Sequence, residues 1–441
     1  MTGYREGDTI CAEATPRGRG GISVVRISGP DASRLIAEIF DKPLPESGRF
    51  KFGRIIISDP EPRPLDDVVV SFFGNPHSYT GEDVIEISTH GSPVIVAELL
   101  EVLYRGGARS ALPGEFTFRA YLNGQIDLTQ AEAVSDLIDA SSREAVQVAL
   151  KQLGGGIGRA CEEIAMLVER LLIYAELELD FVEEDVELSS RDEKLQLVSE
   201  AIEKSEAMLS GYQKSRRLRE GIKVVLTGPP NVGKSSIYNM LLGEARAIVH
   251  KSPGTTRDVL SAKIVIGSFV YEFYDTAGLR ETPEEIEDEG ISRALRAVEE
   301  ADIVVEVESV DLPGFSGKNY QMPVVKVTNK CDMGKPTSTD SISISAKTGL
   351  GIDKLKERLL LIASDDVKLT DGTINRERHY TALNSGLMAL NRGREGLRNG
   401  VPGDMIAEEW REALSAFDEI SGKKRLDEIL NTIFGKFCIG K

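Results

Sequence analysis

Residues 228 to 235 read Gly-Pro-Pro-Asn-Val-Gly-Lys-Ser, which fits the pattern G-x-x-x-x-G-K-[ST]. Backbone N–H groups in a loop of this kind surround phosphate oxygens. Three further motifs follow in order, namely Asp275-Thr-Ala-Gly278, Asn329-Lys-Cys-Asp332 and Ser345-Ala-Lys347. A single glycine-rich match is weak evidence, whereas four motifs in the correct order within about 120 residues predict a GTP-binding domain.

The phosphate-binding loop lies between a predicted strand and a predicted helix. Residues 222–226 form an apolar, β-branched run, and residues 235–242 have helical spacing. The loop therefore ends at a helix N-terminus, where the helix dipole favours anions. We expect Lys234 to reach the β- and γ-phosphates and the Ser235 hydroxyl to bind Mg²⁺. The loop residues expected to contact GTP are Asn231, Val232, Gly233, Lys234, Ser235 and Ser236.

The second motif follows a predicted strand at residues 269–274. Asp275 is therefore expected at the strand end, where its carboxylate would hold the metal through water. Gly278 is expected to leave its N–H close to the γ-phosphate, and Thr276 and Ala277 complete this part of the nucleotide site.

The third and fourth motifs select the base. The Asp332 carboxylate can accept hydrogen bonds from N1–H and the 2-amino group of guanine, and adenine offers neither donor there. A site built around such an acceptor rejects the wrong base because a charge is left unpaired. We expect Asn329 at the other edge of the ring, the Lys330 stem over its face and the Ala346 N–H near O6. Ser345 and Lys347 complete the predicted base site, so the ligand is GTP and not ATP.

Hydrolysis needs an explanation beyond these motifs. Ras-like switches place a glutamine after Asp-x-x-Gly to orient the attacking water, and this chain has Leu279 there. The following residues 280–290 contain several carboxylates. A solvated, acidic helix start is the alternative interpretation for any one of them.

Composition limits the class of protein. A length of 441 residues predicts two to four domains, and a net charge of −18 argues against a uniformly basic surface for nucleic acid. The four cysteines have no paired spacing, so neither a disulfide framework nor a zinc site is indicated. No run of 18 apolar residues and no secretory leader pattern is present, which favours a cytoplasmic protein.

The hydrophobic pattern divides the chain into four segments. Short apolar runs alternate with turns over residues 1–120, which predicts an α+β domain. Helical periodicity dominates 121–219 and returns over 371–441, so we expect one split helical domain with the GTPase domain, 220–370, inserted between its halves. The charge run at 216–220 is interpreted as a solvated face. Arg17, Arg19 and Arg26 surround a glycine-rich turn, which predicts either an anion pocket or a flexible loop.

From about residue 8 to residue 441, the chain resembles the MnmE (TrmE) family of tRNA-modification GTPases. The motifs that carry the resemblance are Thr15-Pro-Arg-Gly-Arg-Gly-Gly21, Pro113-Gly-Glu-Phe-Thr-Phe-Arg-Ala120, Leu128-Thr-Gln-Ala-Glu-Ala-Val134, Gly254-Thr-Thr-Arg-Asp258, Asp275-Thr-Ala-Gly-Leu-Arg280 and Phe437-Cys-Ile-Gly-Lys441. The resemblance implies a folate-binding-like α+β domain, a split helical domain and an inserted Ras-like P-loop GTPase domain.

The resemblance also implies an activity and partners. Members form homodimers through their N-terminal domains and work with an FAD-dependent partner, MnmG, in a heterotetramer. Together they add an aminomethyl or carboxymethylaminomethyl group at C5 of the wobble uridine of tRNA. A 5-formyl- or methylene-tetrahydrofolate supplies the carbon.

Members of the family are activated by potassium, which would explain how GTP is hydrolysed without the glutamine that Ras-like switches use. By motif match, K⁺ would be bound by Asn231, His250, Ser252 and Thr255, and would take the place of an arginine finger. Thr256 matches the threonine that binds Mg²⁺, and Glu287 matches an acidic residue that positions water. Thr255 and Thr256 also belong to the predicted GTP site. The resemblance thus implies catalytic roles for Glu287, Lys234, Asn231, Thr256 and Cys438.

The family's folate pocket maps onto Arg26, Glu86 and Lys441, and onto Gln125 where some members have lysine. Cys438 matches the terminal cysteine of the family, and from the residues alone a buried thiol and a reactive one are equally compatible. The stretch 310–321 departs from the family because it is shorter and richer in glycine than the usual helix before Asn-Lys-x-Asp.

Two alternatives to this enzyme stay open. A switch GTPase that binds ribosome-assembly intermediates would share the Asp-Thr-Ala-Gly-Leu motif and the K⁺ dependence. Such switches usually carry a basic RNA-binding appendage, and this chain is acidic. Folate-dependent aminomethyl transfer without RNA would leave the GTPase motifs unexplained.

Overall fold

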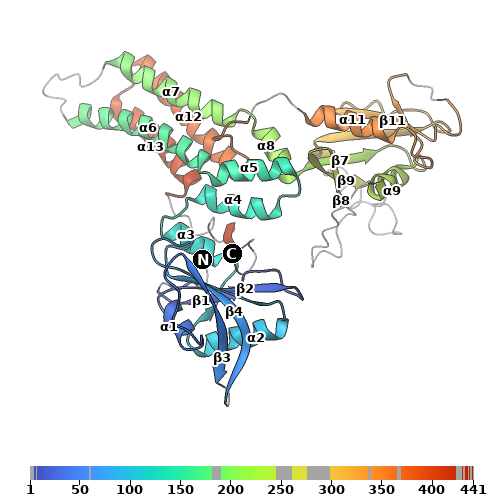
Figure 1. Cartoon of the computed structure of the whole chain (residues 1–441). Helices are drawn as coiled ribbons and strands as arrows, with labels where there is room; N and C mark the ends of the chain where they lie inside the picture. The colour runs from blue at the N-terminus through green and yellow to red at the C-terminus, as the bar shows by residue number, and fades with distance from the viewer. Residues whose placement is uncertain are drawn as a thin grey trace, which may run out of the picture. The chain divides into compact units, whose positions relative to one another are not determined.

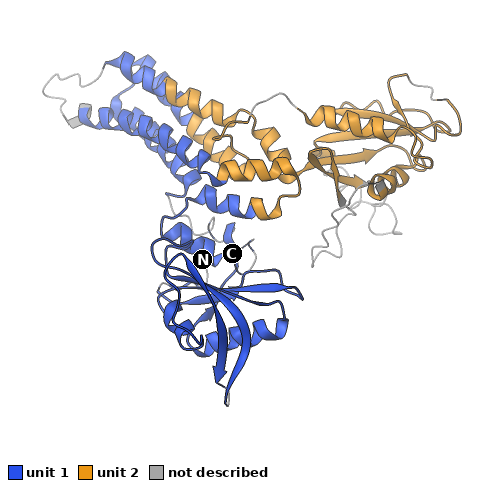
Figure 2. Cartoon of the chain, viewed as in Figure 1, with its two compact units in different colours: residues 1–135, 153–198, 388–441 blue, residues 136–152, 199–387 orange. Residues whose placement is uncertain are grey.

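The computed structural model describes residues 4–5, 7–58, 61–180, 190–244, 261–275, 298–335, 339–364, 369–423, 430, 433–435, 437 and 440. The chain divides into two compact units, one made of residues 1–135, 153–198 and 388–441, the other of 136–152 and 199–387 (Figure 2). The divisions fall inside four helices. The boundaries at 120, 219 and 370 therefore stay predictions.

The N-terminal region is a six-stranded sheet with the order β3-β4-β5-β2-β1-β6 (Figure 1). All neighbours are antiparallel except β1 and β6. Helices α1 and α2 pack on one face through a core that includes Ile27, Ile55 and Leu99. The bounds are β1 Ile10–Glu13, β2 Ile22–Ser28, α1 Ala32–Ala37, β3 Arg49–Ser58, β4 Pro62–Phe73, β5 Val84–His90, α2 Pro93–Arg105, β6 Arg109–Ser110 and α3 Glu115–Leu122.

The helical region comes from two stretches of the chain that pack together. Arg411 on α13 lies 3.2 Å from Glu176 on α6, and the Ile374 N–H, just before α12, donates to Met208 of α7 at 3.3 Å. The bounds are α4 Leu128–Asp139, α5 Arg143–Leu153, α6 Gly156–Asp180, α7 Arg191–Leu209, α8 Tyr212–Glu220, α12 Glu377–Asn399 and α13 Gly403–Ser421. The prediction of one helical domain built from both stretches is confirmed.

A glycine on α12 makes room for a large side chain of α13. Trp410 of α13 is 1 % exposed, and its ring lies where a Cβ at position 393 would be, so only Gly393 leaves room for it. The helices can therefore approach closely around this one large side chain.

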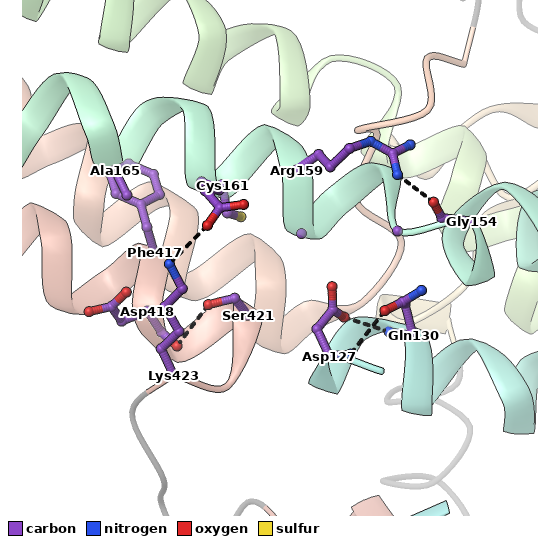
Figure 3. Close-up of a pocket in the computed structure, with 13 residues that line it drawn as sticks. Asp127, Gln130, Gly154, Arg159, Cys161, Ala165, Phe417, Asp418, Ser421 and Lys423 are labelled. Atoms are coloured by element: carbon purple, nitrogen blue, oxygen red, sulfur yellow. Dashed lines mark hydrogen bonds and ion pairs between the residues drawn. The ribbon is translucent and has the colours of Figure 1, made fainter. Parts of the chain in front are cut away.

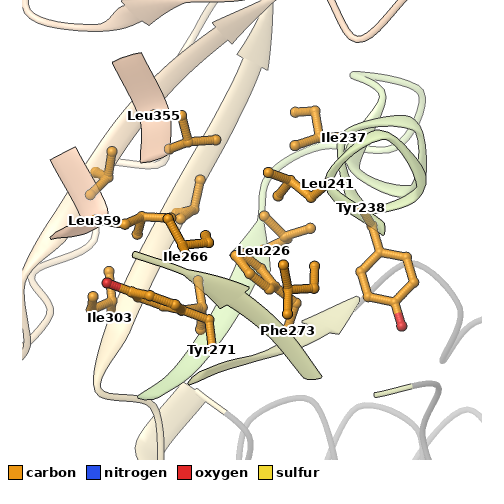
Figure 4. Packing of buried hydrophobic residues seen from close by; sticks show 14 of the residues in the cluster. Leu226, Ile237, Tyr238, Leu241, Ile266, Tyr271, Phe273, Ile303, Leu355 and Leu359 are labelled. Atoms are coloured by element: carbon orange, nitrogen blue, oxygen red, sulfur yellow. The ribbon is translucent and has the colours of Figure 1, made fainter. Parts of the chain in front are cut away.

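The second sheet follows α8 and precedes α12, as an insertion in the helical region. Its order is β12-β11-β10-β7-β9-β8, and all neighbours are parallel except β8 and β9. Helices α9 and α11 contribute Ile237, Leu241 and Leu355 to its apolar core (Figure 4). The bounds are β7 Ile222–Thr227, α9 Lys234–Glu244, β8 Ser261–Ile266, β9 Phe269–Asp275, β10 Ile303–Ser309, β11 Val324–Asn329, β12 Ile342–Ser343 and α11 Ile352–Ala363. This is a Ras-like domain, so the predicted fold class is confirmed.

The connection from β10 to β11 contains no helix over residues 310–323, all of which the structure describes. Parallel neighbours usually need a helical crossover. Here an extended segment makes the connection, in agreement with the departure that the sequence shows at 310–321.

The interpretation of residues 216–220 as a solvated face is wrong for two of them. Arg216 and Arg217 form ion pairs with Asp302 at 2.9 and 3.3 Å, and Asp302 is 7 % exposed. The pairing joins α8 to the start of β10, which is distant in sequence.

Candidate functional site

The phosphate-binding loop has a backbone that its glycines make possible. Gly228 and Gly233 have φ of 137° and 95°, and a Cβ at either position would overlap a neighbour, Val307 O or the Asn329 side chain. Asn231 is also in the left-handed region, with φ of 64°. Glycine adopts such angles at little cost, so the loop can curl tightly between β7 and α9.

Lys234 stands at the first position of α9, as the motif predicts. Its side chain is 6 % exposed, and Nζ donates to the carbonyls of Gly228 and Pro229 at 3.0 and 2.8 Å. The ammonium is thus held inside the curve of the loop, beside a helix N-terminus that already favours anions. Ser235 and Ser236 follow in the first turn of the same helix.

Asn329 joins three of the predicted motifs. Its Nδ2 donates to the carbonyl of Val232 at 2.8 Å, and its Oδ1 accepts from the backbone N–H of Ala346 at 3.0 Å. The side chain is 2 % exposed. Residues more than 90 positions apart along the chain are therefore fixed together by one buried amide, and a buried amide with all these partners rigidifies its surroundings.

Asp332, which is exposed, and Ser345, which is buried, come together in the predicted base site. Ser345 Oγ donates to Asp332 Oδ1 at 2.7 Å, which orients the carboxylate. Lys330 has φ of 62°, and its Nζ lies 2.8 Å from Asp311 Oδ2. Lys347 is exposed beside them. The geometry brings the three motifs into one site, and it fits a nucleotide whose phosphates lie in the loop and whose base lies against Asp332.

Asp275 ends β9 and pairs in register with Leu226, two residues before the phosphate-binding loop. The backbone of Asp275 therefore lies beside the strand that leads into the phosphate-binding loop. A Mg²⁺ site at this loop would need oxygen donors. Several predicted residues lie outside the described part of the chain: His250, Ser252, Thr255, Thr256, Thr276, Ala277, Gly278, Glu287, Cys438 and Lys441.

Two of the predicted folate residues, Arg26 and Glu86, come together in the first sheet. Arg26 of β2 and Glu86 of β5 are register neighbours, and Arg26 Nε lies 2.8 Å from Glu86 Oε1. Arg26 Nη1 also donates to the carbonyl of Gly440 at 3.4 Å, which brings the C-terminal segment to this pair. Gln125 lies against the backbone of Gly81, where a Cβ would approach its Nε2 to 3.0 Å.

Two aromatic rings at this site were not predicted from the sequence. The Arg26 guanidinium lies 5.8 Å from the ring centre of Tyr79 and 5.6 Å from that of Phe116. Burial raises the pKa of Tyr79, so its hydroxyl is neutral at physiological pH and hydrogen-bonds with Thr117. A flat, partly aromatic ligand fits such surroundings. Arg17 and Arg19 are exposed on the preceding loop.

A separate cavity of about 320 Å³ lies between α4, α6 and α13 (Figure 3). Its charged groups have partners nearby: Arg159 donates to the carbonyl of Gly154 at 2.6 Å, and Lys423 lies 3.4 Å from Glu162. Asp127 caps α4 by accepting from the Gln130 N–H at 2.8 Å. These contacts give the cavity a structural explanation, and none of its lining residues belongs to a predicted site.

Comparison with known families identifies both non-GTPase regions. Residues 9–125 match the model of the GTP-binding protein TrmE N-terminus, and residues 128–438 match that of the MnmE helical domain. The chain belongs to the MnmE family. The MnmE tRNA modification GTPase of Christiangramia forsetii is 39 % identical, over 98 % of this chain and 99 % of that protein.

Other MnmE relatives are similar over their full lengths. The tRNA modification GTPase MnmE of Cytophaga hutchinsonii is 40 % identical over 98 % of this chain and 98 % of that protein. The tRNA modification GTPase MnmE of Acinetobacter baylyi is 37 % identical over 98 % of this chain and 96 % of that protein. A crystal structure of Aquifex aeolicus Era bound to GDP and AlF4⁻ shares 26 % identity over 38 % of this chain and 66 % of that chain, with a TM-score of 0.26. Membership of the MnmE family rests on the sequence relationship with the MnmE proteins.

No helix in the described part of the chain combines the length and the apolar character that crossing a membrane would require.

Proposed function

We propose that this chain hydrolyses GTP and uses the hydrolysis in modification of the tRNA wobble uridine at C5. As a member of the MnmE family, the chain is a GTPase that acts in tRNA modification. The observation that carries the GTP site is the buried Asn329 amide, which joins the phosphate-binding loop to the base-recognition motifs. One nucleotide can then contact the phosphate-binding loop and both base-recognition motifs.

The roles of the individual residues follow from that arrangement. The loop N–H groups and Lys234 bind the phosphates, and Asp332 binds the guanine edge. Ser235 and Thr256 are proposed to bind Mg²⁺, which neutralises phosphate charge during transfer. Glu287 is proposed to position the attacking water. Asn231, His250, Ser252 and Thr255 are proposed to bind K⁺, which would supply the positive charge of an arginine finger.

Potassium activation gives a measurable expectation. Replacing Asn231 by alanine should lower the K⁺-stimulated GTP hydrolysis rate by about tenfold, a fraction of what a full arginine finger supplies. Rates should be compared in KCl and NaCl at equal ionic strength. Asn319, exposed on the same unit, provides the control Asn319→Ala. A full K⁺ response in Asn231→Ala would remove Asn231 from the ion site.

The second site is proposed to bind a tetrahydrofolate one-carbon donor. The Arg26–Glu86 pair offers charge and the partly exposed ring of Tyr79 offers flat apolar surface for a pterin, while the buried ring of Phe116 supports the Arg26 guanidinium. Gln125 and Lys441 are proposed to contact the same ligand, and Cys438 is proposed to take part in the modification chemistry. When bound, the folate supplies the carbon, and the FAD-dependent MnmG supplies redox chemistry in a heterotetramer.

We further propose a cytoplasmic homodimer formed through the N-terminal domains. The outer face of the first sheet exposes three large apolar side chains, Ile22, Phe50 and Phe52, at 68 %, 74 % and 60 %. Phe50 and Phe52 lie on β3, an edge strand. Exposed apolar surface of this kind marks an interaction site, and a second copy of the chain is the occupant proposed here.

Deletion of the gene, followed by mass spectrometry of tRNA nucleosides, tests the function. We expect loss of the C5-modified wobble uridine, with restoration by the wild type and not by Cys438→Ser. Restoration by both would keep the pathway and remove Cys438 from the chemistry. An unchanged nucleoside profile with abnormal ribosomal subunits would instead support a ribosome-assembly switch.

A further inference from the structure

Asp311 lies beside the base-recognition motif, although no predicted motif contains it. Its Oδ2 accepts a hydrogen bond from Lys330 Nζ at 2.8 Å, and the two side chains are 49 % and 28 % exposed. The hydrogen bond from Lys330 lowers the pKa of Asp311. Asp311 is therefore ionised at neutral pH and can hold the ammonium.

The turn that carries Asp311 is fixed to the motif by its backbone. Ser309 and Leu312 exchange two hydrogen bonds, at 2.9 and 3.4 Å, so Asp311 stands at the corner of a tight turn. The N–H of Val310 donates to the carbonyl of Asn329 at 3.1 Å. The turn is therefore bonded directly to the residue whose buried side-chain amide lies at the centre of the predicted GTP site.

Two buried carboxylates of β10 hold the segment that follows the turn. Glu308 is 2 % exposed and accepts from the Gly314 N–H at 2.8 Å and from Thr328 Oγ1 at 2.7 Å. Glu306 is 4 % exposed and accepts from the Ser316 N–H at 2.6 Å. Central strands of parallel sheets are usually apolar on both faces. Here the glutamates fasten an extended segment to the sheet, in place of a crossover helix.

We propose that Asp311 is a positioning residue of the GTP site, which acts by holding Lys330. The inference rests on the proposed binding of GTP. With its ammonium paired to Asp311 on the turn, Lys330 presents its methylene groups as a wall for the base. The backbone of Lys330 is left-handed, with φ of 62°, which is rare for a residue with a side chain. Such a conformation persists only when surrounding contacts hold it, and the ion pair with Asp311 is one such contact.

Isothermal titration calorimetry of the full chain with GDP tests the role through a double-mutant cycle. Asp311→Asn removes the charge and keeps the shape, so we expect GDP binding about two- to fivefold weaker, the range for a partly exposed ion pair. Lys330→Met keeps the apolar stem and removes the ammonium. In that background Asp311→Asn should have no further effect, because the pair is already absent.

The outcomes separate the inference from the proposed function. If the wild type does not bind GDP, the proposed GTP site is wrong. If the wild type binds GDP and Asp311→Asn binds equally well, or still weakens binding in Lys330→Met, then Asp311 does not act through Lys330. Asp353→Asn is the matched control, since Asp353 is 93 % exposed and lies 3.9 Å from Lys356 on α11. The Asp311→Asn effect should also shrink in 1 M salt, where exposed charges are screened.

Discussion

Replacement of Asp332 by asparagine should weaken GTP binding by about 10² to 10⁴-fold, because two charge-assisted hydrogen bonds to guanine are lost. The asparagine amide presents a donor where the carboxylate accepts. Xanthine carries a carbonyl at the position of the guanine 2-amino group, so the variant should gain affinity for xanthosine triphosphate. Ser345, which holds Asp332 Oδ1 at 2.7 Å, keeps the new side chain in place.

Competition between GTP, xanthosine triphosphate and ATP measures this change of specificity. Asp340→Asn serves as the control, since Asp340 is 90 % exposed and 3.6 Å from Lys326, away from the base motif. Equal loss of affinity for all three nucleotides would indicate a damaged fold. Unchanged affinity for GTP would show that Asp332 does not contact the base.

Replacement of Arg119 by methionine should destabilise the N-terminal domain by about 3 to 5 kcal/mol, the usual cost of leaving buried charges without their partner. Arg119 is 1 % exposed. Its guanidinium contacts Asp8, lies 3.1 Å from Glu82 and 3.2 Å from Glu115, and Glu115 is 0 % exposed. Removing the arginine leaves these carboxylates close together, and Arg109 still pairs with Asp8 and Glu115.

Hydrogen exchange in peptides from β1, β2 and α3 measures this loss, because it reports on one domain of a multidomain chain. Arg54→Met is the matched control: Arg54 pairs with Asp67 at 2.7 Å, but both are nearly half exposed, so we expect little loss of protection. Equal protection in the two variants would mean that the buried network contributes no more than a surface pair.

The same network predicts an acid dependence. Burial raises the pKa of Asp8, but hydrogen bonds and charges from Arg109 and Arg119 outweigh burial and lower it below its ordinary value of 3.8. The stability that Asp8 contributes is therefore present above that value and is lost as pH falls through the lowered pKa. In Arg119→Met this part of the acid dependence should shrink, which acid titration followed by hydrogen exchange can measure.

Local patterns predicted the GTPase domain well because the decisive residues lie in short, ordered motifs. Residues 222–226 are in β7 and the helix after the loop begins at Lys234, since a buried β-branched run and helical spacing are local properties. The family resemblance assigned Arg26 and Glu86 to one pocket but predicted no ion pair, which the antiparallel register of β2 and β5 produces.

Contacts between distant residues could not be predicted from local pattern. Asp302 and Arg216 are 86 positions apart, and nothing in either stretch indicates that a buried carboxylate would meet the charge run. The same holds for Glu306 and Glu308. Alternating glutamates in a strand are typical of a solvent-exposed face, and only the bound segment 310–316 makes them buried.

The close contact of Trp410 with Gly393 has a practical consequence for spectroscopy. Trp410 is the single tryptophan of the chain, and it is almost fully buried between α12 and α13. Its emission wavelength therefore reports entry of water into that helical contact, and neither sheet contributes an indole signal. The protein thus carries an intrinsic optical probe of the region whose two halves flank the GTPase domain.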